Sequence, residues 1–292
     1  MYKNLHLNTF FNFLAYSNIF VSLAAMAMAA FTIQVMDFQI DFLILFTIFF
    51  ITLFSYNFQR KFNLILHKNI TSSQQNTWIK RFPKLHNSIL IFSFVACIFL
   101  LFHLPKESYF LLIPLALISL LYVLKIGSWP ALRNIPFLKV FIVAFVWAGV
   151  IVLLPALCKS HSFNLIFTLK KQALSLSIAL FVFGQSLPFD IRDMKNDQKD
   201  KLKTIPHQFG VVKTLRICWM SLGTASIICI ISYGIGFISL KESLSLILAL
   251  ASTSLILLYY KKPRRSLDYA ILLEACLMLP LIYYQFIFWI FH

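Results

Sequence analysis

The sequence predicts an all-α integral membrane protein, and three observations support this prediction. Hydrophobic residues make up 60% of the 292 residues, including 32 phenylalanines, which is more apolar surface than a soluble fold of this length would carry. Apolar runs of about 20 residues, the length that spans a bilayer as a helix, recur along the whole chain. In hydrocarbon every backbone polar group must find its partner within its own segment, so these runs are expected to be helices rather than strands.

Nine such transmembrane helices are predicted. The runs cover residues 10–31, 40–58, 87–103, 109–124, 137–157, 171–189, 214–237, 243–260 and 268–290. Nine crossings would place the two ends of the chain on opposite sides of the membrane. Because the runs follow one another so regularly, residues 1–292 are expected to form a single transmembrane domain.

The placement of positive charge predicts the orientation in the membrane. The chain carries 26 Lys and Arg against 10 Asp and Glu, a net charge of +16. With a cytoplasmic N-terminus, the basic residues of the outer segments are Lys106, Lys159, Lys170, Lys171 and Lys241. All the others fall in inner segments, which is the positive-inside bias. We therefore expect a multi-pass protein with its C-terminus outside, in the inner membrane if the cell is bacterial. The basicity sets topology and attracts anionic headgroups or substrates, and no nucleic-acid partner is expected.

Two long polar connections divide the predicted helices. One covers about 59–86, after the second helix, and the other about 190–213, after the sixth, both on the predicted cytoplasmic side. They lie four helices apart. This spacing predicts two pseudo-repeated four-helix halves and a ninth helix around a central cavity, with the two connections facing each other over its mouth.

The second connection begins with an acidic stretch, DIRDMKNDQKD, at 190–200, which holds four of the 10 acidic residues of the chain. Asp190, Asp193 and Asp197 are spaced i, i+3 and i+7, so a helix at about 100° per residue would carry them on one face. The opposite face is expected to carry Arg192, Lys195 and Lys199. Carboxylate oxygens are the ligands that hard divalent cations prefer, which predicts a metal site at this end of the sixth helix.

The same stretch resembles the second aspartate-rich motif of the UbiA-like intramembrane prenyltransferases. Asp190-x-x-Asp193-x-x-x-Asp197 matches that motif. The continuation resembles the Lys-Thr-x-Pro run and the glycine that follow it in the family, here Lys203, Thr204, Pro206 and Gly210. Nine helices with cytoplasmic loops after the second and sixth also fit, so the resemblance in architecture covers the full length, whereas the specific motif covers 190–210.

This resemblance implies transfer of an isoprenoid chain from a prenyl diphosphate to a hydrophobic, usually aromatic, acceptor. In the family, carboxylates bind Mg²⁺, which neutralises the diphosphate as the allylic C–O bond ionises. A dry cavity shields the carbocation from water, and aromatic rings can stabilise it. The metal ligands implied here are Asp190, Asp193 and Asp197, holding one Mg²⁺.

The first connection departs from the family's pattern Asn-Asp-x-x-Asp-x-x-x-Asp. From Asn57 this chain reads NFQRKFNLI, so Phe58, Lys61 and Ile65 replace the three aspartates in register. A second magnesium site is therefore not expected. In one interpretation Arg60 and Lys61, on one helix face with Asn57, replace the missing metal and bind the diphosphate. In the other they form salt bridges to the aspartates of the second connection, which would give a metal-free protein that keeps the fold.

Other basic residues near the predicted cytoplasmic helix ends are further candidates for contacts with a diphosphate. Lys125 resembles the lysine of the family's Tyr-Ser-x-x-x-Lys-Arg segment, and Arg133 and Lys139 follow closely. The expected diphosphate-binding set is Asn57, Arg60, Lys61, Lys125, Lys201 and Lys203. Basic residues at such helix ends are also expected from topology alone.

Three functions are compatible with these patterns. The leading one is a membrane prenyltransferase, and the second is a non-catalytic protein of the same scaffold that binds isoprenoids or lipids. The third is a small transporter, against which the acidic cluster lies at a helix end rather than at the midplane. Glu274, an acid inside the ninth predicted helix, is expected either to pair with a cytoplasmic cation or to face the cavity.

Overall fold

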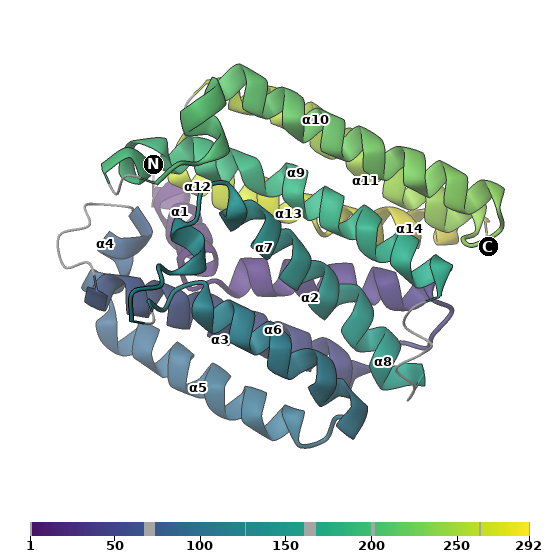
Figure 1. Ribbon diagram of the computed structural model, residues 1–292, viewed down its shortest axis with the longest axis horizontal. Helices are drawn as coiled ribbons and strands as arrows, with labels where there is room; N and C mark the ends of the chain where they lie inside the picture. The colour runs from purple at the N-terminus through teal and green to yellow at the C-terminus, as the bar shows by residue number, and fades with distance from the viewer. Residues whose placement is uncertain are drawn as a thin grey trace.

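The computed structural model describes residues 2–66, 74–125, 127–160, 168–199, 202–262 and 264–291. These residues form a bundle of helices joined by short connections (Figure 1). The helices of the first half are α1 (Tyr2–Tyr16), α2 (Ile19–Val35), α3 (Phe42–Leu66), α4 (Gln74–Arg81), α5 (Pro83–Leu101), α6 (Tyr109–Leu121), α7 (Leu138–Ala148) and α8 (Leu154–Ser160). The helices of the second half are α9 (Leu169–Lys199), α10 (Ile205–Gly234), α11 (Leu240–Leu257), α12 (Ser266–Asp268), α13 (Glu274–Cys276) and α14 (Leu279–Phe291).

The described helices confirm the prediction of an all-helical membrane protein. Six helical stretches are long and apolar enough to cross a bilayer, or up to eight if each of two bent pairs counts as one crossing. The fourth predicted run forms α6, which has 13 residues and is shorter than the roughly 20 that a bilayer requires. The count of nine crossings and the division into two repeated halves therefore stay predictions.

The helices pack around one extended apolar core. In Figure 1, α2 runs through the middle, with α3, α5 and α6 on one side of it and α10, α11 and α14 on the other. α9 packs along α10 and also against α7, so the acidic end of α9 lies beside the start of α7. The two labelled chain ends lie at opposite ends of the bundle (Figure 1).

The first predicted helix is broken where two polar residues interrupt its apolar sequence. α1 and α2 meet at an angle of 66°, and Asn18 at the junction has a left-handed backbone with φ 62°. Asn57 of α3 is fully buried and ties this junction to the bundle. Its amide nitrogen donates to the carbonyl oxygens of Ser17 (3.0 Å) and Leu53 (2.8 Å), and its oxygen accepts from the amide of Asn18 (3.0 Å).

Two short π-helical stretches expose backbone carbonyls that side chains of other helices bind. Gly149–Leu153 connects α7 to α8 just before Pro155, and Thr32 of α2 donates to the carbonyl of Ile151 (2.7 Å). Tyr269–Leu273 connects α12 to α13, and Gln185 of α9 donates to the carbonyl of Leu273 (2.8 Å). Wide turns of this kind are often found at functional sites. The second stretch therefore makes the region around Gln185 of α9 a candidate functional site.

We expect Asn57→Ala to destabilise the fold, because it removes three buried hydrogen bonds at the α1–α2 junction. At roughly 1 kcal/mol for each bond, the loss is about 3 kcal/mol. Thermal unfolding in detergent should show a lowered midpoint. The control is Asn134→Ala, at an exposed asparagine, which should leave the midpoint within about 1 °C. Equal midpoints for the two variants would contradict the role given to Asn57.

Candidate functional site

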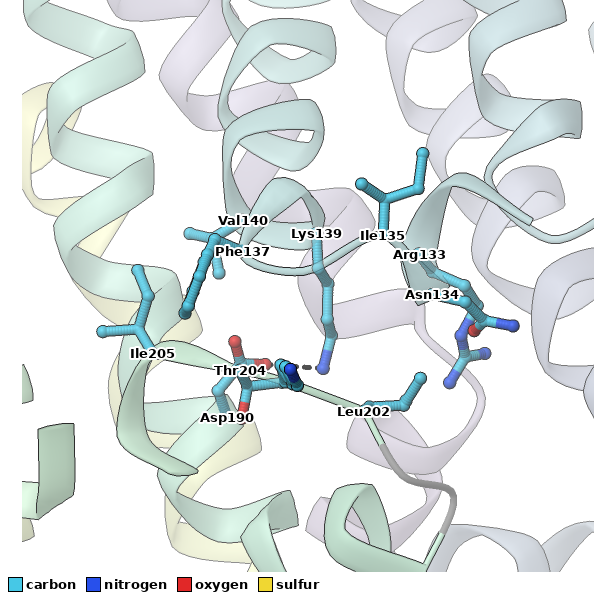
Figure 2. Close-up of a pocket in the computed structure, with 11 residues that line it drawn as sticks. Arg133, Asn134, Ile135, Phe137, Lys139, Val140, Asp190, Leu202, Thr204 and Ile205 are labelled. Atoms are coloured by element: carbon cyan, nitrogen blue, oxygen red, sulfur yellow. Dashed lines mark ion pairs between the residues drawn. The ribbon is translucent and has the colours of Figure 1, made fainter. Parts of the chain in front are cut away.

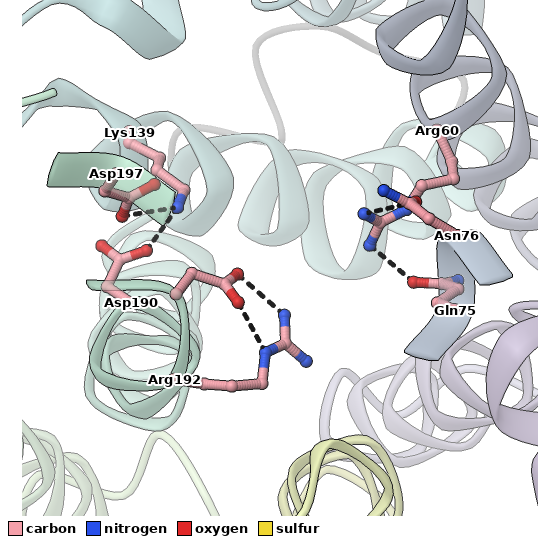
Figure 3. A network of polar contacts seen from close by, with 8 residues as sticks. Arg60, Gln75, Asn76, Lys139, Asp190, Arg192 and Asp197 are labelled. Carbon is pink, nitrogen blue, oxygen red and sulfur yellow. Dashed lines mark hydrogen bonds and ion pairs between the residues drawn. The ribbon is translucent and has the colours of Figure 1, made fainter. Parts of the chain in front are cut away.

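α9 carries two of the predicted carboxylates into a buried position. Asp190 is 2% exposed and Asp197 is 4% exposed, and both face Lys139 at the start of α7. The ammonium nitrogen of Lys139 lies 2.5 Å from Oδ1 of Asp190 and 3.9 Å from Oδ2 of Asp197 (Figures 2 and 3). The second distance is too long for a hydrogen bond, and Oδ2 of Asp197 is buried without a hydrogen-bond partner among the described residues. Two carboxylates thus share one cation.

The third carboxylate, that of Asp193, is bound by Arg192. The guanidinium donates to both carboxylate oxygens at 2.8 Å, the paired geometry of a strong arginine–carboxylate contact. Arg192 also lies over the rings of Phe189 and Tyr269, at 5.1 Å and 5.9 Å from their centroids. The sequence placed Arg192 on the helix face opposite the aspartates, and this was wrong, because its long side chain turns back along α9 to its neighbour.

The three residues predicted from the first connection contact three different parts of the bundle. Arg60 donates to Gln75 (2.5 Å) and Asn76 (3.5 Å) of α4, Lys61 donates to Asn87 of α5 (2.9 Å), and both hydrogens of the Asn57 amide are used at the α1–α2 junction. In the described part of the chain, neither Arg60 nor Lys61 forms a salt bridge with an aspartate of α9.

Arg60 nevertheless faces the acidic end of α9. Its guanidinium lies close enough to Asp193, Arg192 and Arg133 for their charges to interact, and Figure 3 shows it across a gap from Arg192. The two predicted connections thus begin within electrostatic range of each other, and the repeated arrangement from which their facing was inferred stays a prediction. The role of Arg60 in binding an anion stays a prediction.

The remaining predicted basic residues differ in whether they lie near the acidic cluster. Lys203 and Arg133 line the small pocket of Figure 2 together with Lys139 and Asp190, and no described residue pairs with the guanidinium of Arg133. Lys125 is exposed and lines none of the cavities considered below. Lys201 lies outside the described residues.

Two cavities that share lining residues lie in the bundle, and the first of them reaches this cluster. The first, of about 190 Å³, is lined by Asp190, Arg192 and Asp193 at one end, and we call it the polar cavity. The second, of about 370 Å³, is lined by apolar side chains of α3, α5, α6 and α7, and we call it the apolar cavity. Tyr56 and Trp147 line both cavities, and the indole nitrogen of Trp147 donates to the Tyr56 hydroxyl at 3.1 Å.

The walls of the polar cavity hold several polar residues that the sequence patterns did not single out. They are Tyr56, Trp147, Gln185 and Ser186. They come from helices far apart in the sequence and follow no motif, so only the packing reveals them. Glu274 also lines this cavity, which is one of the two positions expected for it.

The residues present fit one divalent cation in part. A metal needs carboxylate oxygens that converge, and those of Asp190 and Asp197 do so, with the unpartnered oxygen of Asp197 left to be satisfied. The point of convergence is held by the ammonium of Lys139, and Asp193 is held by Arg192. Among the described residues no group of three or more acidic, histidine or cysteine side chains is arranged to hold an ion. The arrangement therefore fits a two-carboxylate site from which Lys139 has to withdraw.

Comparison with known proteins identifies a matching family and solved structures of similar fold. A model of the UbiA prenyltransferase family matches residues 84–285. A search of curated proteins finds no sequence match. Among solved structures, a UbiA homologue from Archaeoglobus fulgidus superimposes with a TM-score of 0.60 at 12% identity, over 94% of this chain and 98% of the homologue. A structure of digeranylgeranylglyceryl phosphate synthase superimposes with a TM-score of 0.56 at 15% identity, over 94% of this chain and 96% of that chain. At these identities the structural matches show a shared fold.

The buried carboxyl of Asp197 predicts a pH dependence of stability. Burial raises its pKa to about 6, the charges of Asp190 and Asp193 add to the rise, and Lys139 opposes it. In the unfolded chain the same group titrates near 3.8, so between these values only the folded protein holds the proton. Its contribution to stability is therefore greatest below about pH 4 and is lost as the pH rises to about 6.

We expect Asp197→Asn to raise the midpoint of thermal unfolding more at about pH 7.5 than at about pH 4.5, because the amide carries no charge to desolvate. The control is Asn134→Ala, at an exposed side chain that does not ionise, which should shift the midpoint equally at both pH values. An equal shift at both pH values for Asp197→Asn would contradict the raised pKa.

Proposed function

Because the chain belongs to the UbiA prenyltransferase family, we propose that this multi-pass membrane protein transfers an isoprenoid chain from a prenyl diphosphate to a hydrophobic acceptor. An aromatic ring is the acceptor that the family resemblance implies. The proposal places the acidic end of α9, and with it the N-terminus, on the cytoplasmic side, in agreement with the positive-inside bias.

The observation that carries this proposal is the meeting of charges at the mouth of the two cavities. Asp190 and Asp197 converge on Lys139, and Arg133 lines the pocket beside them. The charges of Arg60 and Arg192 act on Asp193, on the same end of α9. Carboxylates with a cation between them and guanidinium groups at their rim suit a diphosphate, which needs positive charge on several oxygens. A headgroup bound here would direct its chain into the protein interior.

Asp190 and Asp197 would hold one Mg²⁺. When bound, Mg²⁺ supplies positive charge to the departing diphosphate. Lys139 would then turn from the carboxylates toward the diphosphate, and its charge would remain within the site. Lys61 stands in register with one aspartate of the family's other carboxylate group, but it contacts Asn87, so Arg60 beside it would supply the positive charge on that side. The guanidinium of Arg60 can donate two parallel hydrogen bonds to phosphate oxygens.

The apolar cavity suits the isoprenoid chain. Its volume of about 370 Å³ lies in the range of small-molecule pockets, and its walls are mostly apolar. Tyr56 and Trp147 stand where it joins the polar cavity, near the position of the ionising carbon. Their rings can stabilise the allylic cation by their faces, and the surrounding apolar side chains exclude water from it.

One observation favours a second function, the non-catalytic binding of isoprenoids or lipids. Each described aspartate of the motif already has a cation of the protein near it, Lys139 for Asp190 and Asp197 and Arg192 for Asp193. A protein in which these pairs never open would keep both cavities and bind a chain without releasing diphosphate. Binding without release distinguishes this function from the proposed one.

We expect the purified protein in detergent, with Mg²⁺ and a labelled prenyl diphosphate, to bind the diphosphate and release its headgroup. Asp190→Asn and Asp197→Asn should each slow the release by about 100-fold or more, because each removes charge from the site of ionisation. Asp37→Asn, at the far side of the bundle from this site, should release at the rate of the unaltered protein. Release at the unaltered rate in both Asp190→Asn and Asp197→Asn would refute the acidic site.

Arg60 and Lys61 provide a matched pair of adjacent cations. Arg60→Ala should weaken prenyl diphosphate binding by about 10-fold or more, because a charge-assisted hydrogen bond is worth roughly 1.5–3 kcal/mol. Lys61→Ala should change the binding constant by less than about twofold, since Lys61 contacts Asn87 on the exposed side of α3. Equal losses in the two variants would contradict the geometry assigned to Arg60.

A further inference from the structure

The apolar cavity reaches the surface of the bundle on one side. The exposed residues among those that line it come from two helices only, and they are Phe94 and Ile98 of α5 and Ala116 and Leu120 of α6. Phe94, Ile98 and Leu120 are each at least 40% exposed. All the other lining residues are buried or half-buried. The cavity therefore opens between α5 and α6, and we call this the α5–α6 opening.

The packing of the two helices explains this opening. α5 and α6 follow one another in the chain, and they are tied where the chain turns, because the hydroxyl of Tyr109 donates to the carbonyl of Leu101 (2.6 Å). Along the rest of its length α5 packs on α3, whereas α6 packs on α7 and on the turn Gly149–Leu153. The two helices thus belong to different walls of the apolar cavity, and the cavity lies open between them.

The end of the cavity where α6 meets the turn Gly149–Leu153 is filled by packed side chains. Leu115 and Ile151 line it and are 4% and 1% exposed. A Cβ atom added to Gly149 would lie 2.8 Å from Cδ1 of Leu115, so the glycine leaves room for the leucine to pack directly on the backbone of the turn. Thr32 of α2 binds the carbonyl of Ile151 and fixes the turn from behind. A chain that fills the cavity therefore cannot continue in this direction.

The opening lies between the charged end and the closed end of the cavity. The lining residues of α6 run from Tyr122 to Leu112, ten residues or about 15 Å along the helix. Tyr122 marks the charged end, because it lies within range of the charge of Lys139. Ala116 and Leu120 stand between these two limits. A chain that enters from the charged end thus meets the opening at its side before it reaches the closed end.

We propose that the isoprenoid chain of the donor leaves the protein through the α5–α6 opening and ends in the bilayer. The inference rests on the proposed function and assigns the donor to a class, prenyl diphosphates whose chains are longer than the cavity can hold. A pocket of about 370 Å³ encloses a drug-sized ligand, so a chain of many isoprene units extends beyond it. The opening is apolar and faces hydrocarbon, so the emerging chain passes between apolar surroundings without exposure to water.

The test measures binding of a short and a long donor in lipid nanodiscs with Mg²⁺. The probes are analogues of geranyl and octaprenyl diphosphate whose ester oxygen is replaced by sulfur, so that they bind without ionising. We expect the unaltered protein to bind both, because the units of the long chain beyond the opening lie in lipid. Binding of the geranyl analogue with exclusion of the octaprenyl analogue would overturn the proposal and leave the proposed function standing. If neither analogue binds, the proposed function itself fails.

Two adjacent positions of α6 locate the exit. Ala116→Trp places a large ring in the opening, and we expect it to raise the Kd of the octaprenyl analogue at least about tenfold more than that of the geranyl analogue. Ile98→Trp, on the α5 side of the opening, should discriminate in the same direction. The matched control is Leu117→Trp, at an exposed residue that does not line the cavity, which should change neither Kd by more than about twofold.

Retained binding of the geranyl analogue shows that each variant is folded. Equal losses for the two analogues in Ala116→Trp, or the same effect from Leu117→Trp as from Ala116→Trp, would contradict an exit between α5 and α6.

Discussion

The interaction on which the candidate site depends is that of two buried carboxylates with a single ammonium group. Asp190 and Asp197 are held apart from water on α9, and Lys139 reaches them from α7. Removing one partner from such a buried group of charges is costly, since it leaves the remaining charge without compensation. The contact therefore fixes α7 against α9. Under the proposed function a metal ion would bind between the two carboxylates only after Lys139 had moved away from them.

Other cations lie near these carboxylates and would attract an anionic substrate. Arg133 lies beside Lys139 and Asp190, and Arg60 and Arg192 act on Asp193, so an arriving diphosphate would meet positive charge from more than one helix. A family member with two carboxylate groups obtains this charge from bound metal. In this chain Phe58, Lys61 and Ile65 replace the first group of aspartates. Under the proposed function the adjacent Arg60 would supply part of the missing charge. The charged residues of α9 line the polar cavity, whereas α3, α5, α6 and α7 line the apolar cavity.

The sequence predicted those features that depend on local pattern. Apolar runs of bilayer length gave the helices, and the i, i+3, i+7 spacing placed the aspartates together on α9. The partners of these aspartates could not be predicted, because Lys139 approaches from another helix and Arg192 folds back over its own. Asn57 matched a motif position, yet its amide is used at the break between α1 and α2. Glu274 is identifiable in the sequence as an acid in an apolar run. Its position in the same cavity as Gln185 depends on a π-helical turn, which has no clear sequence signal.

The most direct measurement is a structure of the protein with Mg²⁺ and a prenyl diphosphate analogue whose ester oxygen is replaced by sulfur, so that it does not ionise. The account predicts that the ion lies between Asp190 and Asp197, that the ammonium of Lys139 has moved from Asp190 to the diphosphate, and that the isoprenoid chain fills the apolar cavity. A structure in which the analogue is bound while Lys139 remains on Asp190, with no ion between the two carboxylates, would contradict it.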